Sequence, residues 1–451
     1  MRTPTIAIIG GGPGGLMAAY FLQKYVSVPV RISLFEASDR LGGKILTLQF
    51  HAAHARYEAG AAEFYDYSPV DHDPLKELVA ELGLSINPMG GSAVIINQHI
   101  LGNLDDVREH LGPQVSSALT LFDRQAKDRM TPQEFYHSDE PLPLHVVPQQ
   151  PRFDTYLANL TQPTRHYVEN LIHSDLATEP QNTSLEYGLQ NYLMNDPAYM
   201  RLYSIEGGNE RLPRELAARL QADMRLNHQV TAVAKVGEQL QVTFRSAAGV
   251  QATAFDFVVV ALPHNGLSGI AFQGDRLSVA MSEHISHYNH PAHYLRITIL
   301  FDRPFWRGKL TDSYCMLDRF GGCCLYDESS REPGAEHSVL GWLLGGEQAQ
   351  SLSNLTDEQL VAEALASLPE FLAHGREFMV EGRVHRWIGA INAIPGGIVR
   401  RSLDRRHQPE PNDHAQLFVV GDYLYDATLN GVLDSADYVA NWIAALLAER
   451  C

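Results

Sequence analysis

A run of glycines near the amino terminus has the residue types and the spacing needed to bind a phosphate group. Gly10, Gly12 and Gly15 follow the G-x-G-x-x-G pattern, with Pro13 and Gly14 between the last two. Glycines at these positions permit a tight turn, close approach of the backbone to a pyrophosphate, and close packing of a following helix. The predicted chemistry is binding of a dinucleotide, with its pyrophosphate at a helix amino terminus.

The elements that would position these glycines can be predicted from their neighbours. Residues 5–9 are a short apolar run typical of a buried strand, and residues 16–24 follow a helical pattern. A second strand at residues 31–35 ends at Glu36, whose carboxylate can accept hydrogen bonds from both ribose hydroxyls. Because this acid disfavours a 2′-phosphate, the pattern predicts FAD or NAD rather than NADP.

Composition and charge exclude several classes of protein. Of the 451 residues, 45% are hydrophobic and 20% are charged, which is typical of a folded chain with more than one domain. The 35 Lys and Arg against 53 Asp and Glu give a net charge of −18, so no nucleic-acid partner is expected. No apolar stretch predicts a membrane span, because glycines interrupt the first one. The four cysteines lack metal-ligand spacing, so a cytoplasmic location and no metal site are expected.

The segment that contains Glu36 resembles a known flavoprotein signature. Residues 36–44, EASDRLGGK, are similar to the E-x-x-x-R-x-G-G-R pattern of the flavin-containing amine oxidase superfamily, which includes monoamine, polyamine and L-amino-acid oxidases. The resemblance implies FAD as the cofactor. The residues of this segment that it implies in FAD binding are Glu36, Ala37, Arg40, Gly43 and Lys44.

Two further segments resemble the same family in the same order. Gly60 and Ala61 are similar to its strand beneath the flavin, and residues 205–213 are similar to its return into the FAD domain. Val230 opens the strand pair whose backbone is expected to meet the adenine. The resemblance therefore extends well beyond the first motif.

The end of the chain resembles the carboxyl-terminal flavin motif of the family. Gly421 would let the chain turn against a ligand, and Asp422 could bond a ribityl hydroxyl or the pyrophosphate through water. A helix is predicted over residues 432–447. The N–H groups of its first turn, at Val432 and Leu433, would then point toward the flavin ring.

The positions of these motifs predict the domain organisation. A discontinuous Rossmann-type FAD-binding domain is expected from residues 1–70, 205–270 and 385–451. The inserts, residues 71–204 and 271–384, would form an interleaved α+β substrate domain. The predicted fold class is therefore α/β, with the substrate between the two domains.

Local signals predict single elements within both inserts. Asp73 and Pro74 are typical of a helix start and Gly83 of its end, so a helix is expected between them. The second insert begins with a strand pattern at residues 293–301.

That strand carries a departure from the family pattern. Many amine oxidases of the family have a lysine in the strand that ends in Pro-Phe-Trp, and the matching position here is Arg296. Arginine keeps the charge but does not give up its proton, and its planar fork suits a carboxylate. Fast reaction with oxygen is therefore not expected, and the electron acceptor stays open. Arg296 is either a substrate contact or a strand-end charge paired with a surface acid.

A second departure lies beside the expected flavin face. L-Amino-acid oxidases usually carry an arginine shortly after the equivalent of Ala61, but this chain has Glu63. Glu63 could anchor a cationic or N–H-bearing substrate, act as a general base, or pair with Arg296; the alternative is an exposed strand end. Tyr65 and Trp387 are candidate walls of the substrate pocket. An α-amino acid is therefore a poorer candidate than an amine.

Two features of monoamine oxidases are not evident in this chain. Val432 stands where the resemblance would place one of the two aromatic residues that enclose the amine. No cysteine lies within residues 387–397, where those enzymes attach the flavin covalently. Non-covalent FAD is therefore expected.

A histidine repeat offers a different kind of site. His284, His287, His290 and His293 recur at every third residue, a spacing that can bring imidazoles to one face of a helix. Pro291 interrupts the segment, so a loop leading into the strand is expected rather than a metal site.

The predicted function is FAD-dependent oxidation of a C–N bond in an amine-type small molecule, by hydride transfer to flavin N5. One alternative is a flavin-dependent desaturase, dehydrogenase or amide oxidase that acts on a larger biosynthetic intermediate. Isomerisation by reduced flavin and a non-catalytic carrier with the same fold are two others. The oligomeric state stays open, with a homodimer as one alternative.

Overall fold

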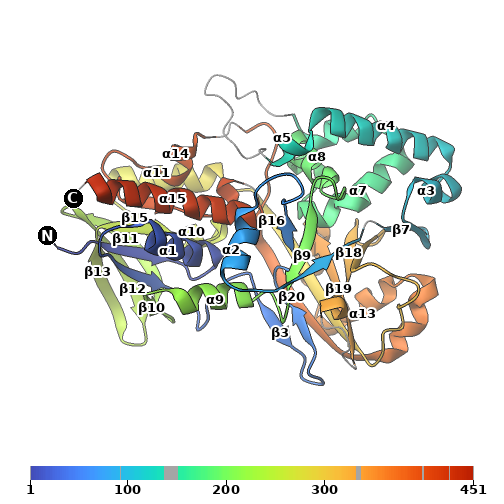
Figure 1. Ribbon diagram of the computed structural model, residues 1–451, viewed down its shortest axis with the longest axis horizontal. Coiled ribbons are helices and arrows are strands. Elements are labelled where there is room, and N and C mark those ends of the chain that lie inside the picture. Colours follow the sequence, from blue (N-terminus) through green and yellow to red (C-terminus); the bar gives the residue numbers. More distant parts are fainter. Residues whose placement is uncertain are drawn as a thin grey trace.

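The computed structural model describes residues 2–91, 93–136, 151–331, 337–398, 401–425 and 427–449. Both termini lie at one end of the molecule, where helices cover a parallel sheet (Figure 1). Helices of the first insert lie at the other end, with a long mixed sheet beside them. Among the described residues, no helix is both long enough and apolar enough to cross a membrane.

The parallel sheet contains the strand that precedes the glycine-rich loop. Its strands, in spatial order, are β10 (Asp223–Arg225), β2 (Arg31–Phe35), β1 (Thr5–Ile9), β14 (Phe257–Val260) and β21 (Leu417–Val419). Each neighbouring pair is parallel. β1 and β14 are almost fully buried, as expected for strands in which nearly every residue is apolar. This arrangement agrees with the predicted α/β fold class.

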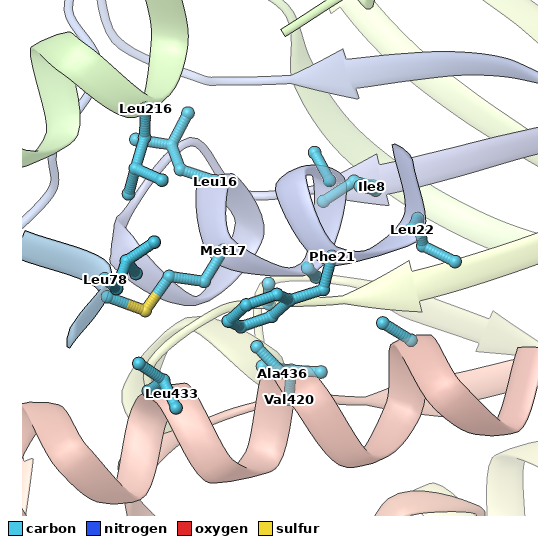
Figure 2. Packing of buried hydrophobic residues seen from close by; sticks show 14 of the residues in the cluster. Ile8, Leu16, Met17, Phe21, Leu22, Leu78, Leu216, Val420, Leu433 and Ala436 are labelled. Carbon is cyan, nitrogen blue, oxygen red and sulfur yellow. The ribbon is translucent and has the colours of Figure 1, made fainter. Parts of the chain in front are cut away.

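One face of this sheet is covered by the first and last helices of the chain, α1 (Pro13–Tyr25) and α15 (Leu429–Glu449). Figure 2 shows Phe21 of α1 above Ala436 of α15, and Met17 of α1 on the side of Leu433. Residues from both ends of the sequence therefore share one apolar core. The shorter helices that join this core are α2 (Pro74–Glu81) and α9 (Arg211–Arg219).

The other face packs against a smaller sheet. Ala7 and Ile9 of β1 point into this second core, because side chains alternate along a strand. The strands of the smaller sheet, in spatial order, are β13 (Gly249–Phe255), β12 (Gln239–Ser246), β11 (Gln229–Val236) and β15 (Ala271–Gln273). The helices of this region are α10 (His264–Leu267), α11 (Asp275–His287), α14 (Leu403–His407) and the short η4 (Asp422–Leu424).

The mixed sheet joins both inserts. Its strands, in spatial order, are β20 (Met379–Asn392), β16 (Pro291–Phe301), β19 (Ser338–Gly345), β18 (Cys323–Asp327), β17 (Tyr314–Leu317), β7 (Val94–Ile96) and β8 (His99–Leu101). β20 pairs with β16 along most of its length. The expected domain boundary at residue 385 therefore falls inside a strand of this sheet. The short helices beside it are η2 (Glu328–Arg331), α12 (Gly346–Leu352), α13 (Asp357–Ser367) and η3 (Glu370–Phe378).

The first insert is largely helical, as the sequence predicts. Helix α2 begins after Asp73, whose carboxylate accepts a hydrogen bond from the Lys76 N–H at 3.0 Å, and it ends before Gly83. The prediction for this helix is confirmed. The other helices of the insert are α3 (Leu104–His110), α4 (Pro113–Arg129), α5 (Pro132–Tyr136), α6 (Phe153–Leu157), α7 (Gln162–Leu176), η1 (Pro180–Asn182) and α8 (Leu185–Leu193).

Short antiparallel strands hold the residues next to Gly60. β3 (Thr47–Gln49) pairs with β4 (Arg56–Glu58), just before this glycine. A separate small sheet has β9 (Arg201–Ile205) between β5 (Phe64–Asp66) and β6 (Ile86–Met89). Glu63 and Tyr65 therefore lie beside the strand that leads the chain back toward α9.

Candidate active site

Of the three glycines of the G-x-G-x-x-G pattern, only Gly12 has open space beside it, as a pyrophosphate site requires. Gly10 has φ +111°, and a Cβ there would lie 2.4 Å from the carbonyl oxygen of Ala261. A Cβ at Gly15 would lie 1.9 Å from the Gly10 oxygen, so α1 packs too closely on β1 for any side chain. At Gly12, by contrast, a Cβ would meet only Gly43, at 3.8 Å. The loop is therefore open at the amino terminus of α1, where an anion is favoured.

Glu36 is held at the end of β2 by backbone donors. Its two carboxylate oxygens accept hydrogen bonds from the N–H groups of Gly11 and Ser38, each at 2.8 Å. Ala37 is exposed beside this carboxylate, and β11 with Val230 begins next to it. These contacts bring the predicted ribose and adenine residues together at one edge of the sheet.

Lys44 links the two predicted flavin motifs. Its ammonium group donates to the Asp422 carboxylate at 3.0 Å and to the Ala390 carbonyl at 2.9 Å. Arg40 donates to the backbone carbonyl of Gly43 at 2.5 Å. This hydrogen bond closes the short loop between Arg40 and Lys44. The segment that follows Glu36 and the segment that begins at Gly421 therefore meet in space.

The final helix starts earlier than the sequence predicts. α15 begins at Leu429, and the Val432 N–H already donates to the Thr428 carbonyl at 3.2 Å. The predicted start at residue 432 is wrong, because the Thr428 hydroxyl caps the helix by accepting the N–H three residues on, at 3.1 Å. Leu433 is 3% exposed in the core, while a Cβ at Gly14 would come within 3.4 Å of Val432. The amino termini of α1 and α15 are therefore neighbours.

Gly60 and Ala61 lie in the segment between β4 and β5 and not in the expected strand, because the chain bends after Glu58; this segment is fixed from two sides. A Cβ at Gly60 would lie 1.9 Å from a backbone oxygen, so two chain segments cross there in direct contact. The Asn209 side-chain amide donates to the carbonyls of Ala61 and Ala62, both at 3.0 Å. Trp387 donates its indole N–H to the carbonyl of residue 59 at 2.7 Å. The half-buried indole is therefore held directly against this segment.

Arg296 is completely buried in the middle of β16. Its guanidinium donates to the backbone carbonyl of Glu58, forms an ion pair with Glu328, and lies 5.0 Å from the ring centroid of Tyr326. Burial alone would lower the pKa of Arg296, but the Glu328 charge reverses the shift and raises it. The alternative that Arg296 pairs with a surface acid is wrong, because both side chains of this pair are inaccessible.

Glu63 lies close to Asp175 and to several tyrosine rings. Burial and the Glu63 charge raise the pKa of Asp175, which is in the last turn of α7, well above its usual range. Burial also raises the phenol pKa values of Tyr65, Tyr294 and Tyr326, and both carboxylates contribute to each shift. The Tyr294 hydroxyl donates to the Asp175 backbone carbonyl at 3.3 Å. We call these five residues the carboxylate–tyrosine cluster.

Reasoning from the sequence missed part of this site. Asp175 follows no motif, and only the packing of α7 brings it to Glu63. Glu328 was missed for the same reason, since it comes from a short helix after β18. Tyr294 could have been found, because it lies two residues before Arg296 and therefore on the same face of the strand.

The histidine repeat is divided between two elements. His284 and His287 lie in α11, His290 follows that helix, and His293 lies in β16. The expectation of a loop is therefore wrong for the first half, because α11 continues through residue 287 and His284 extends the buried face formed by Leu277 and Met281. Within the described ranges, no group of three His, Cys, Asp or Glu side chains could hold a metal ion.

Comparisons with known proteins agree with this geometry. The family described as flavin containing amine oxidoreductase matches residues 13–444. The flavin-dependent L-tryptophan oxidase RebO of Lentzea aerocolonigenes is 23% identical over 96% of each chain. Putrescine oxidase bound to putrescine has a similar fold, with a TM-score of 0.75, 20% identity and 99% of each chain covered. Cyclohexylamine oxidase from Brevibacterium oxydans has a TM-score of 0.73 and 17% identity, over 99% of this chain and 100% of that one.

These comparisons confirm the resemblance that the sequence motifs indicate. The family match includes α1 and most of α15, the two helices whose amino termini meet beside the glycine-rich loop. The chain belongs to the flavin-containing amine oxidoreductase family and is a flavin-dependent oxidoreductase.

Proposed function

We propose that this protein binds FAD non-covalently and oxidises a C–N bond of an amine. The carboxylate–tyrosine cluster is the observation that carries the proposal. Carboxylates attract an ammonium group, and tyrosine rings interact favourably with a cation placed over their faces. The cluster includes Glu63 and Tyr65, which follow the segment at Gly60 and Ala61. An amine held there would lie beside that segment.

The residues around the glycine-rich loop fit FAD. The pyrophosphate would bind at the open side at Gly12. The Glu36 carboxylate now accepts from the Gly11 N–H, and with FAD bound it would accept from the ribose hydroxyls instead. Lys44 and Asp422 would hold the middle of the cofactor. Bound FAD would supply the acceptor for a hydride from the substrate carbon. No cysteine lies within residues 387–397, in keeping with non-covalent binding.

One of the two carboxylates of the cluster would also accept the proton that the substrate ammonium loses. Burial and the Glu63 charge raise the pKa of Asp175, so Asp175 would keep its proton to a higher pH than an ordinary carboxyl group. An ammonium must lose a proton before its C–N bond can be oxidised to an imine. A carboxylate oxygen of Asp175 or Glu63 would accept that proton, and the tyrosine rings would exclude water.

Anaerobic reduction of the flavin by a panel of amines, amino acids and polyamines tests the proposal. We expect bleaching of the flavin absorbance by at least one class of amine, and slower bleaching in Glu63→Gln and Asp175→Asn. Glu169→Gln is the matched control, because Glu169 lies in the same helix as Asp175 but pairs with Arg165 at 2.7 Å. Failure of every amine to bleach the flavin would contradict the proposal.

A second candidate is a dehydrogenase that passes electrons to an acceptor other than oxygen and acts on a larger biosynthetic intermediate. The burial of Arg296 favours it, because this residue replaces the lysine of many amine oxidases and is held by Glu328. Reoxidation of the reduced protein by oxygen and by a quinone separates the candidates. Faster reoxidation by oxygen would support the amine oxidase, and faster reoxidation by the quinone the dehydrogenase.

A further inference from the structure

A cavity of about 60 Å³ lies beside the histidine repeat, of which His287 and His290 line it. The other lining residues are Tyr288, residues 392–395, Ile398, Arg401, Arg406 and residues 423–425. One water molecule needs about 15 Å³ by the same measure, so the cavity suits a small ion rather than a nucleotide. None of the five residues of the carboxylate–tyrosine cluster lines it.

The charged groups around this cavity are basic, although the chain carries a net charge of −18. Burial lowers the pKa of His284 to about 3, and the charges that lower it further belong to Arg401 and other histidines. Burial and Arg401 also lower the pKa of His287, which lines the cavity. These rings are therefore neutral near pH 7, and each presents one N–H donor. Arg401 remains as a permanent positive charge.

Several polar groups at the cavity have unused bonding capacity. Arg401 donates to the backbone carbonyl of Glu283 at 3.4 Å, and no carboxylate of the described chain forms an ion pair with it. Tyr423 lines the cavity and is 6% exposed, yet its hydroxyl has no hydrogen-bond partner among the described residues. The ring of His284, which contacts the Tyr423 ring, is likewise buried without a partner in this part of the chain. Buried polar groups normally have partners, so the Tyr423 hydroxyl is available to a ligand in the cavity.

We propose that this cavity is a second ligand site, which binds a small carboxylate or phosphate through Arg401 and His287. The guanidinium fork matches two oxygens of either anion, and the neutral imidazole adds one N–H donor. Tyr423, which also lines the cavity, would donate its hydroxyl. The site adjoins the proposed flavin residues, since Tyr423 follows Asp422 directly.

Calorimetric titration of the FAD-loaded protein tests the proposal, with inorganic phosphate and sodium acetate as separate probes at constant ionic strength. We expect saturable binding of at least one probe at a single site. Binding of phosphate alone would identify a phosphate site, and binding of acetate alone would identify a carboxylate site. Absence of saturable binding by both probes would overturn the proposal.

Substitutions at the cavity make the test specific. Arg401→Gln and His287→Phe should each weaken binding about tenfold or more, because the first removes the charged guanidinium fork and the second removes the imidazole N–H donor. Arg405→Gln is the matched control, since Arg405 is exposed on the adjacent α14 and does not line the cavity. Equal weakening in the control would show a general charge effect and overturn the proposal. Flavin absorbance verifies folding, and His287→Phe keeps the test valid if Arg401→Gln does not fold.

The cofactor-free protein supplies the last control. Binding that occurs only after FAD is removed would place the anion in the cofactor site and overturn the proposal of a separate site. Equal binding with and without FAD would support it. This outcome does not depend on whether an amine is the substrate.

Discussion

Removal of one partner from the buried Arg296–Glu328 ion pair should destabilise the protein strongly. The two side chains are 1% and 0% exposed, so neither charge is hydrated in the folded state. In Glu328→Gln the arginine keeps its charge and the Glu58 carbonyl but loses its carboxylate partner. Loss of one member of a buried pair costs about 3–5 kcal/mol. The nearby Glu63 charge still acts on Arg296, which favours the lower end of this range.

The expected change can be measured by thermal unfolding of the FAD-loaded protein. An unfolding entropy of about 2.1 cal/mol/K per residue, over 451 residues, gives a shift of about 1 °C for each kcal/mol. Glu328→Gln should therefore lower Tm by about 3 °C. Glu215→Gln is the control, because its pair with Arg219 has side chains that are 39% and 37% exposed. That change should lower Tm by less than about 1 °C.

The double variant Arg296→Met/Glu328→Leu distinguishes two causes of the lost stability. One is loss of the attraction between the two charges, and the other is the cost of a buried charge without a partner. Because both charges are removed together, no buried charge remains without a partner, and much of the lost stability should return. A Tm for Glu328→Gln that equals the Glu215→Gln value would refute this reasoning. So would a double variant that is less stable than Glu328→Gln.

Three further changes test other parts of the molecule. Gly15→Ala puts a Cβ 1.9 Å from a carbonyl oxygen and should remove most of the bound flavin, whereas Gly90→Ala, with nothing within 4 Å, should leave flavin absorbance unchanged. Glu36→Gln removes a charged acceptor and should weaken FAD binding about tenfold in a fluorescence titration of the cofactor-free protein; an unchanged affinity would contradict the assignment. Burial and Glu63 raise the pKa of Asp175, so the folded chain holds a proton that the unfolded chain releases above about pH 4. Stability therefore falls as pH rises through the folded pKa, and Asp175→Asn should raise Tm more at pH 8 than at pH 4; equal shifts would argue against the raised pKa.

Local signals in the sequence predicted single elements well. Asp73 and Gly83 mark the start and end of α2, because a capping side chain and a positive φ act within a few residues. The start of α15 was misjudged by three residues, because the cap at Thr428 lies before the apolar stripe that indicated the helix. The histidine repeat was misjudged because the stripe of α11 continues into it.

Charge pairing was not predictable from the sequence. Arg296 could have been a substrate contact or a surface charge, and only the packing of β16 against β4 and η2 shows a buried pair with Glu328. The assignment of Arg296 as a substrate contact stays a prediction, as do the pocket roles of Tyr65 and Trp387. A side chain's partner depends on strands that are remote in sequence.

The sequence by itself determined the cofactor class, because the glycine pattern and Glu36 lie within one strand–helix–strand unit and their spacing follows from backbone geometry. It also determined the family, through motifs that recur in order along the chain. Only the tertiary structure decided what surrounds the substrate position. Glu63, Asp175 and Tyr294 come from three separate segments, and the packing of α7 against the mixed sheet that contains β16 brings Asp175 and Tyr294 together near Glu63. The basic cavity has the same origin, since Arg401 meets His287 only when α11 and the segment before α14 fold against each other.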